Sequence, residues 1–261
     1  MIDRQLIFVG IMISDLHASD IMFEELFFFD PEDKAFCRQF CRKRNIDFLP
    51  VEGEEKLMEL NGSVFEERSL EPNLRFDPNS TLLNNELVGP FNQKPTRFAF
   101  KDGEFKGVLH FSDYNNSVVY KEAYETLYFV EQKLRYIFEN NHLEKEVKDR
   151  FEDDEHFAPL SKSKLRDVLE KSFKFSDEFE VSFFHQEDQE VISDIVDFRN
   201  RVMHAKEFVS LTEESKINMH YDRESFFKFV DTTRKLEKLY SELDHKIDSY
   251  PRDTVAFTRL T

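Results

Sequence analysis

This chain of 261 residues has few of the residues that form tight turns, and it has no tryptophan. Only 6 glycines and 8 prolines are present, which argues against a loop-rich β-sandwich. Neither a GxxxxGK[S/T] loop nor a GxGxxG loop occurs, and this excludes the two common glycine-rich phosphate cradles.

Cysteine and long apolar runs are also scarce. Cys37 and Cys41 stand four residues apart, too few for a disulfide framework or a zinc site, and we expect two buried apolar groups in a reducing cytosol. The apolar run from Leu6 to Ile13 is too short to span a membrane. Without the basic flank of a signal peptide, the chain is predicted to be cytoplasmic and to bind no membrane.

Basic residues are outnumbered, with 36 Lys and Arg against 53 Asp and Glu and a net charge of −17. This excludes a broad basic surface for non-specific nucleic-acid binding, although a narrow Arg-lined cleft stays open. Phenylalanine is abundant, at 30 residues, and it predicts a packed core rather than disorder.

The pattern of apolar residues changes near residue 116. Short apolar strands alternate with short helices before this point, and long amphipathic helices follow it. We therefore predict an α+β chain with an N-terminal α/β repeat pair (1–116), a C-terminal all-α helical bundle (117–250) and a tail (251–261).

The first part contains an internal repeat. The Phe-Asp-Pro sequence of 29–31 recurs at 76–78, and 46–54 (IDFLPVEGE) aligns with 96–104 (TRFAFKDGE). Each copy predicts a strand, a helix that the Asp caps, a second strand, a glycine turn and a third strand.

This repeat resembles a tandem pair of CBS repeats, most clearly in "DPEDKAF…NIDFLPVEG" and "FKDGEFKGVLHFSDY". The resemblance implies an adenosine nucleotide as a regulatory ligand, with Asp113 on the ribose hydroxyls. His110 occupies the position where the family has a hydroxyl residue that contacts phosphate. Copy one ends in Leu57–Leu60 with no matching Asp, so at most one site is supported. The alternative is a ligand-free pair that serves for dimerisation.

The second part predicts four amphipathic helices, over 117–138, 161–173, 188–204 and 223–247. On the third, the apolar stripe of Ile192, Ile195 and Val202 also includes position 199, which is an arginine. A buried arginine must be paired or must face a cleft.

Polar residues gather around this arginine. Asn200 and His204 are four residues apart and share one strip of the helix. Asp194 and Asp197 lie upstream, where they could orient Arg199 or His204.

The run from Arg199 to His204 resembles the Arg-polar-x(3–5)-His motif of HEPN-domain proteins, four-helix bundles that usually dimerise and are often metal-independent endoribonucleases. The resemblance implies that Arg199, Asn200 and His204 are catalytic and that no metal or cofactor is required. Because the chain is acidic, the RNA would need a narrow basic cleft, which Arg201 could line. RNA and a second copy of the chain are the implied partners, and a toxin or defence role follows by analogy with the family.

Two alternatives stay open. Arg199 could be a structural residue that pairs with an Asp inside the bundle. The whole chain could be a non-catalytic nucleotide-sensing module that only dimerises or binds a partner protein.

Overall fold

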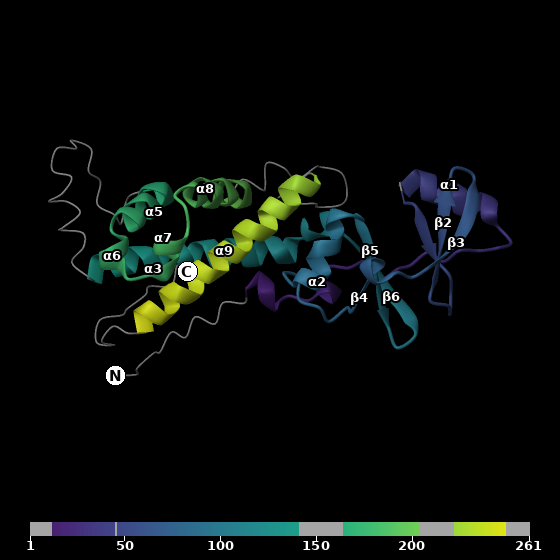
Figure 1. Cartoon of the computed structure of the whole chain (residues 1–261), viewed down its shortest axis with the longest axis horizontal. Helices are drawn as coiled ribbons and strands as arrows, with labels where there is room; N and C mark the ends of the chain where they lie inside the picture. Colours follow the sequence, from purple (N-terminus) through teal and green to yellow (C-terminus); the bar gives the residue numbers. More distant parts are fainter. Residues whose placement is uncertain (1–11, 45, 141–163, 204–221, 249–261) are drawn as a thin grey trace. The chain divides into compact units, whose positions relative to one another are not determined.

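The computed structural model describes residues 12–44, 46–140, 164–203 and 222–248, which Figure 1 draws in colour. The chain is mixed α+β: the described part has two three-stranded sheets and a C-terminal helical region. It forms two compact units, the α/β unit (13–119 and 222–226) and the helical unit (12, 120–140, 164–203 and 227–248). The tail predicted over 251–261 lies outside the described residues.

The first half of the α/β unit is a helix followed by an antiparallel sheet. The sheet follows α1 (Lys34–Arg44) and has the order β1 (Phe48–Pro50), β2 (Lys56–Asn61), β3 (Val64–Ser69). The final strand predicted over 57–60 is β2, whereas β3 was not predicted. The strand predicted to end at 29–31 is absent, since residues 24–30 form no strand, so copy one has its three strands after α1 rather than one before it and two after it.

The two cysteines anchor α1 to this sheet. Cys37 and Cys41 are both fully buried and form a core cluster with Leu49 of β1, which confirms their predicted place in the core. Burial, helped by the neighbouring Cys37 and Asp47, raises the pKa of the Cys41 thiol to about 11. Both thiols are free and belong to the core of this unit.

The second half of the unit has a different sheet. Strand β4 (Arg75–Phe76) is parallel to β5 (Thr96–Lys101), which pairs antiparallel with β6 (Glu104–His110). The crossover between β4 and β5 contains the short helix α2 (Asn85–Val88). Copy two thus has the predicted order of strand, helix, strand, turn and strand.

The two Phe-Asp-Pro sequences have the same local role, which is not the predicted helix cap. Asp30 Oδ1 accepts a hydrogen bond from the Glu32 amide, and Asp77 Oδ1 accepts one from the Asn79 amide, both at 2.8 Å. Each Asp therefore stabilises a turn ahead of its helix. The cap of α1 is Asp33, which accepts from the Phe36 amide at 3.0 Å.

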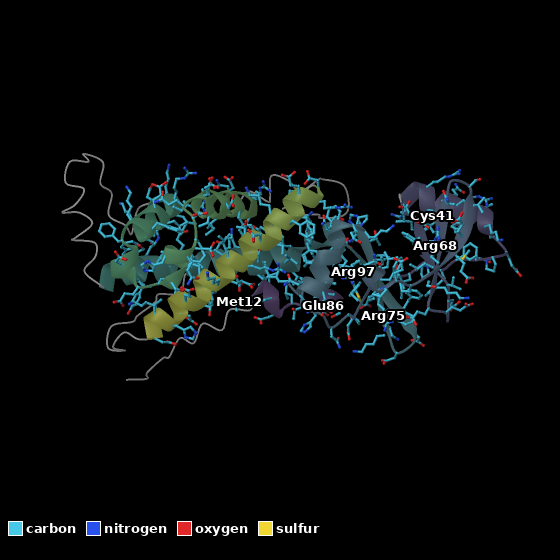
Figure 2. The ribbon with its side chains drawn as sticks, in the orientation of Figure 1. Met12, Cys41, Arg68, Arg75, Glu86 and Arg97 are labelled. Carbon is cyan, nitrogen blue, oxygen red and sulfur yellow. The ribbon has the colours of Figure 1, made fainter. Side chains whose placement is uncertain are left out.

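A buried arginine ties the irregular segments of copy two together. Arg97 of β5 is 2 % exposed and donates to the carbonyls of Asn73 (3.0 Å), Glu86 (2.8 Å), Leu87 (2.6 Å) and Arg75. Figure 2 labels Arg97, Glu86 and Arg75 at this point of the unit. Burial lowers the pKa of Arg97 to about 10, because the charge is removed from water.

The helical unit is built from two long helices and several shorter ones. Its elements are α3 (Ser117–Asn140), α5 (Leu165–Lys174), α6 (Ser176–Phe179), α7 (Ser182–Gln186), α8 (Glu190–Met203) and α9 (Arg223–Asp248), with α3 and α9 each beginning in the α/β unit. The four predicted helices correspond to α3, α5, α8 and α9, while α6 and α7 were not predicted. Among the described residues, no helix is both long and apolar enough to cross a membrane.

A buried lysine connects the two long helices. Lys133 of α3 is 7 % exposed, and its Nζ lies 2.5 Å from Asp244 Oδ1 and 3.6 Å from the centre of the Tyr240 ring, both on α9. Burial lowers the pKa of Lys133, although Asp244 opposes the shift. This contact fixes how α3 and α9 face each other inside the unit.

Candidate functional site

Helix α8 carries the predicted catalytic motif, and its apolar side is firmly packed. Val191, Ile192, Ile195, Phe198 and Val202 are all buried. The Phe198 ring lies 5.6 Å from the Phe229 ring of α9, centre to centre. The motif therefore lies on a helix whose orientation in the unit is fixed by packing.

Arg199 lies at the margin of this apolar stripe and is half-buried. At about 100° per residue, Ile195 and Val202 form the centre of the stripe, with Phe198 on one side and Arg199 on the other. Position 199 was predicted to lie within the stripe, but Phe198 is the buried residue there and Arg199 borders it. Within the part of the chain that the structure describes, the guanidinium has no ion pair or hydrogen bond.

The two predicted acidic partners point elsewhere. Asp194 forms an ion pair with Lys228 of α9, with 2.7 Å between Oδ1 and Nζ. Asp197 is exposed, and it lies about 160° around the helix from Arg199. Neither carboxylate neutralises Arg199 here, so its charge stays available to an external anion.

The remaining residues of the motif are partly covered by the structure. Asn200 is exposed and Arg201 is half-buried, both in the last turns of α8. His204 lies outside the described residues. The structure therefore places Arg199, Asn200 and Arg201 at one end of α8, and the convergence with His204 stays a prediction.

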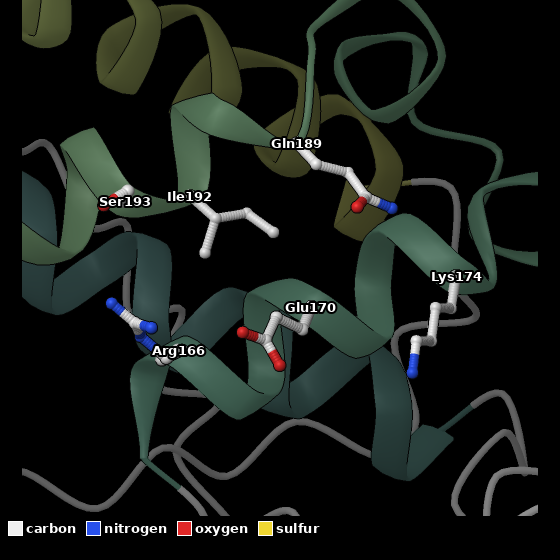
Figure 3. Close-up of a pocket in the computed structure, with 6 residues that line it drawn as sticks. All are labelled: Arg166, Glu170, Lys174, Gln189, Ile192 and Ser193. Carbon is white, nitrogen blue, oxygen red and sulfur yellow. The ribbon is translucent and has the colours of Figure 1, made fainter.

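A hollow of about 310 Å³ lies between α5 and α8 and was not predicted from the sequence. Figure 3 shows Ile192 of α8 and Glu170 of α5 on opposite sides of it, with Arg166 and Lys174 to either side. The only sequence signal was the spacing of four between Arg166, Glu170 and Lys174, which predicts one helical strip.

Arg199 lies on nearly the same side of α8 as the residue that lines this hollow. Ile192 lines the hollow, and Arg199 is seven residues later, which is about 20° from the same face of α8. Arg199 therefore extends the α5-facing side of α8 by two turns beyond the hollow. Arg166 and Lys174 add positive charge to this side, partly offset by Glu170.

The predicted nucleotide-binding residues lie in the α/β unit and make local contacts. The His110 amide donates to Asp113 Oδ2 at 2.7 Å, which closes the short 3-10 helix Phe111–Tyr114. The His110 ring Nδ1 lies 2.7 Å from Ser112 Oγ and accepts from the Ser112 amide at 3.1 Å. Asp113 and His110 are thus close together, and both hold the end of β6.

No family model, curated protein or solved structure matches this chain. The described residues contain no group of three or more His, Cys, Asp or Glu side chains that could hold a metal ion.

Proposed function

We propose that the chain is an endoribonuclease of HEPN type that needs no metal ion and cleaves RNA in a cleft between two copies of the chain. The observation that carries this proposal is Arg199. It is a half-buried cation on a packed helix, and no carboxylate of a described residue pairs with it. Because an arginine in this environment needs a counter-charge, an RNA phosphate is a suitable ligand.

The chemistry divides between two side chains. The 2′-oxygen of the ribose attacks the adjacent phosphorus, the bond from phosphorus to the 5′-oxygen breaks, and a 2′,3′-cyclic phosphate forms. His204 takes the proton of the 2′-hydroxyl, and a protonated His204 from the second copy gives one to the leaving 5′-oxygen. Arg199 holds the non-bridging oxygens, whose negative charge grows in the transition state.

Asn200 completes the proposed site. The exposed Asn200 amide can donate to a phosphate oxygen or orient His204. Arg201 adds positive charge at the same end of α8, although it lies about 160° around the helix from Arg199. A two-fold axis beside this end would bring two such sets together, which supplies both the base and the acid.

The repeat pair is proposed to regulate this activity through an adenosine nucleotide. The contact between Asp113 and the His110 amide favours the alternative that the pair is ligand-free, because one carboxylate oxygen is already used. Calorimetry with AMP and ATP distinguishes a repeat pair that binds a nucleotide from one that is ligand-free. Heat of binding that Asp113→Ala abolishes supports regulation, and no heat leaves the pair as a dimerisation platform.

The cleavage proposal is tested with purified variants and a fluorescent RNA in the presence of a chelator. We expect His204→Ala to lower the cleavage rate by about 10² or more, because a proton-transfer group is lost. Arg199→Ala should cost about 10²–10³, and Arg199→Lys should recover part of it.

Lys106→Ala is the matched control, since it removes one cation that pairs with Glu104 in the α/β unit. It should cleave at the parent rate. Unchanged cleavage in His204→Ala or Arg199→Ala would overturn the proposal. RNA binding without cleavage by the parent chain would favour the non-catalytic binding module.

A further inference from the structure

Helix α1 is the most basic of the helices that the structure describes. Its eleven residues (KAFCRQFCRKR) contain no acidic side chain, and its basic residues are Lys34, Arg38, Arg42, Lys43 and Arg44. The whole chain carries a net charge of −17, so a helix of this charge stands out among the described elements. This concentration calls for an anionic partner.

The buried face of α1 directs these charges outward. Cys37 and Cys41 face the core, and Lys34, Arg42, Lys43 and Arg44 are exposed. Arg38 Nη1 and Arg42 Nη2 donate to the carbonyls of Ser63 (3.5 Å) and Gly62 (3.3 Å) in the β2–β3 turn. These bonds position the helix and involve carbonyl oxygens, so they do not neutralise the two guanidinium charges.

No basic side chain of α1 forms an ion pair with a carboxylate of the described residues. The sheet beside it behaves differently, because Lys56 pairs with Glu54 and Glu67, and Arg68 pairs with Glu59 and Glu66. Lys56 and Arg68 of this sheet thus pair with carboxylates of the sheet and its turn, whereas the cations of α1 have no such pair among the described residues.

An exposed aromatic ring accompanies the charges. Phe36 is 51 % exposed, although its large apolar side chain would be more stable out of water. Phe27 holds it from one side with 5.6 Å between ring centres, and Phe27 itself stacks on Phe40 at 4.2 Å. Lys43 is seven residues beyond Phe36 and so lies on nearly the same side of α1.

We infer that a surface formed by Phe36 and the basic C-terminal end of α1, with Arg42, Lys43 and Arg44, binds single-stranded RNA. The basic side chains contact successive phosphates, and a base stacks on the open side of the Phe36 ring. A single strand is specified because a base inside a duplex cannot reach the ring. The choice of RNA as the ligand rests on the proposed function, whereas the surface is identified from its exposed cations and ring alone.

The test measures affinity separately from cleavage. A fluorescent 12-nucleotide RNA is titrated by anisotropy with His204→Ala full-length protein as the parent, so that cutting does not interfere. The triple variant Arg42→Gln, Lys43→Gln, Arg44→Gln should bind at least tenfold more weakly. Its log–log salt dependence should flatten by about 2, because each phosphate contact on a single strand contributes about 0.7.

Phe36→Leu tests the ring, since leucine stays apolar but cannot stack. We expect about fivefold weaker binding or more. The matched control neutralises three other cations of the α/β unit, Lys94→Gln, Lys101→Gln and Lys106→Gln, and gives the same net charge as the triple variant. It should bind RNA nearly as well as the parent. Circular dichroism checks that α1 and the sheets are intact in every variant.

The outcomes separate this inference from the proposed function. Equal losses in the α1 and control triples, or parent affinity in the α1 triple, would overturn it even if the chain cleaves RNA. A loss confined to α1 supports it even if the chain with His204 intact cuts nothing. If the α1 triple variant no longer binds a poly-glutamate peptide but binds RNA with the affinity of the parent, the surface binds an acidic protein segment and the inference is wrong.

Discussion

The α/β unit and the helical unit each bury one cation, and they satisfy it in different ways. Arg97 donates to four backbone carbonyls of short elements, those of Asn73 in a 3-10 helix, Arg75 in β4, and Glu86 and Leu87 in α2. Lys133 has the Asp244 carboxylate and the Tyr240 ring. Carbonyls inside a long helix already accept hydrogen bonds, so a cation between helices needs side-chain partners. Short elements instead leave carbonyls without a backbone donor, and one arginine, with its five N–H groups, can donate to several of them.

The largest expected effect is on the Arg97 side of this comparison. Arg97→Met keeps most of the volume but leaves buried carbonyls without donors, so the free energy of unfolding should fall by about 3–5 kcal/mol. Urea denaturation of the full chain measures it. Arg75→Met is the control, because its pair with Glu55 is exposed and should be worth about 1 kcal/mol or less. A loss of only about 1 kcal/mol for Arg97→Met would mean that water donates hydrogen bonds to the four carbonyls in the variant.

The Cys41 thiol gives a pH-dependent effect of intermediate size. Its pKa rises from 9.0 to about 11 on folding, so the folded chain holds this proton more tightly than the unfolded chain. The contribution is therefore complete below pH 9 and is lost as the pH rises from about 9 to 11, with a fall of about 1–2 kcal/mol. Unfolding free energies of the parent and of Cys41→Ala across this range measure it. Identical slopes would contradict the assignment.

The smallest effect is expected at Lys133. Lys133→Met should change the free energy of unfolding by about 1 kcal/mol or less, because losing the ion pair is offset by removing a desolvated charge. Asp244 is about half exposed and is solvated once it is unpaired. The lowered pKa of Lys133 means that the unfolded chain binds this proton more tightly. Stability therefore rises with pH towards 10.5 in the parent, and this rise should be missing in the variant.

The result at Lys133 decides how far the two units differ. A loss of 3 kcal/mol or more in Lys133→Met would show that the lysine is as necessary as Arg97. A cation bound by carbonyls and a cation bound by a carboxylate would then contribute equally to the free energy of unfolding. Asp244→Asn, which keeps the shape of the partner, shows whether any loss comes from the ion pair itself.

The long helices could be predicted from the sequence because their apolar period continues for many turns. The ends predicted at 117 and 138 for α3 compare with Ser117 and Asn140, and those at 223 and 247 for α9 with Arg223 and Asp248. Helices α6 and α7 have four and five residues, too few to show a period. Strand β3 was missed because its side chains are mostly exposed and lack an alternating pattern.

The candidate site could be predicted in part. The pattern of α8 identified Arg199 as unusual, and its half-buried place beside an apolar stripe agrees with that. It could not show that Asp194 pairs with Lys228 instead, since this contact depends on how α8 packs on α9. Arg97 was overlooked for a similar reason: a single arginine in a short strand is usually exposed, and its four carbonyls are up to 24 residues away.

The most direct test of the central claim is the chemistry of the RNA ends that the chain produces in a chelating buffer. If Arg199 and His204 cleave RNA as proposed, the products carry 2′,3′-cyclic phosphate and 5′-hydroxyl ends, and both disappear in Arg199→Ala and His204→Ala. RNA left intact by the parent chain, or the same ends produced at the parent rate by either variant, would contradict the account.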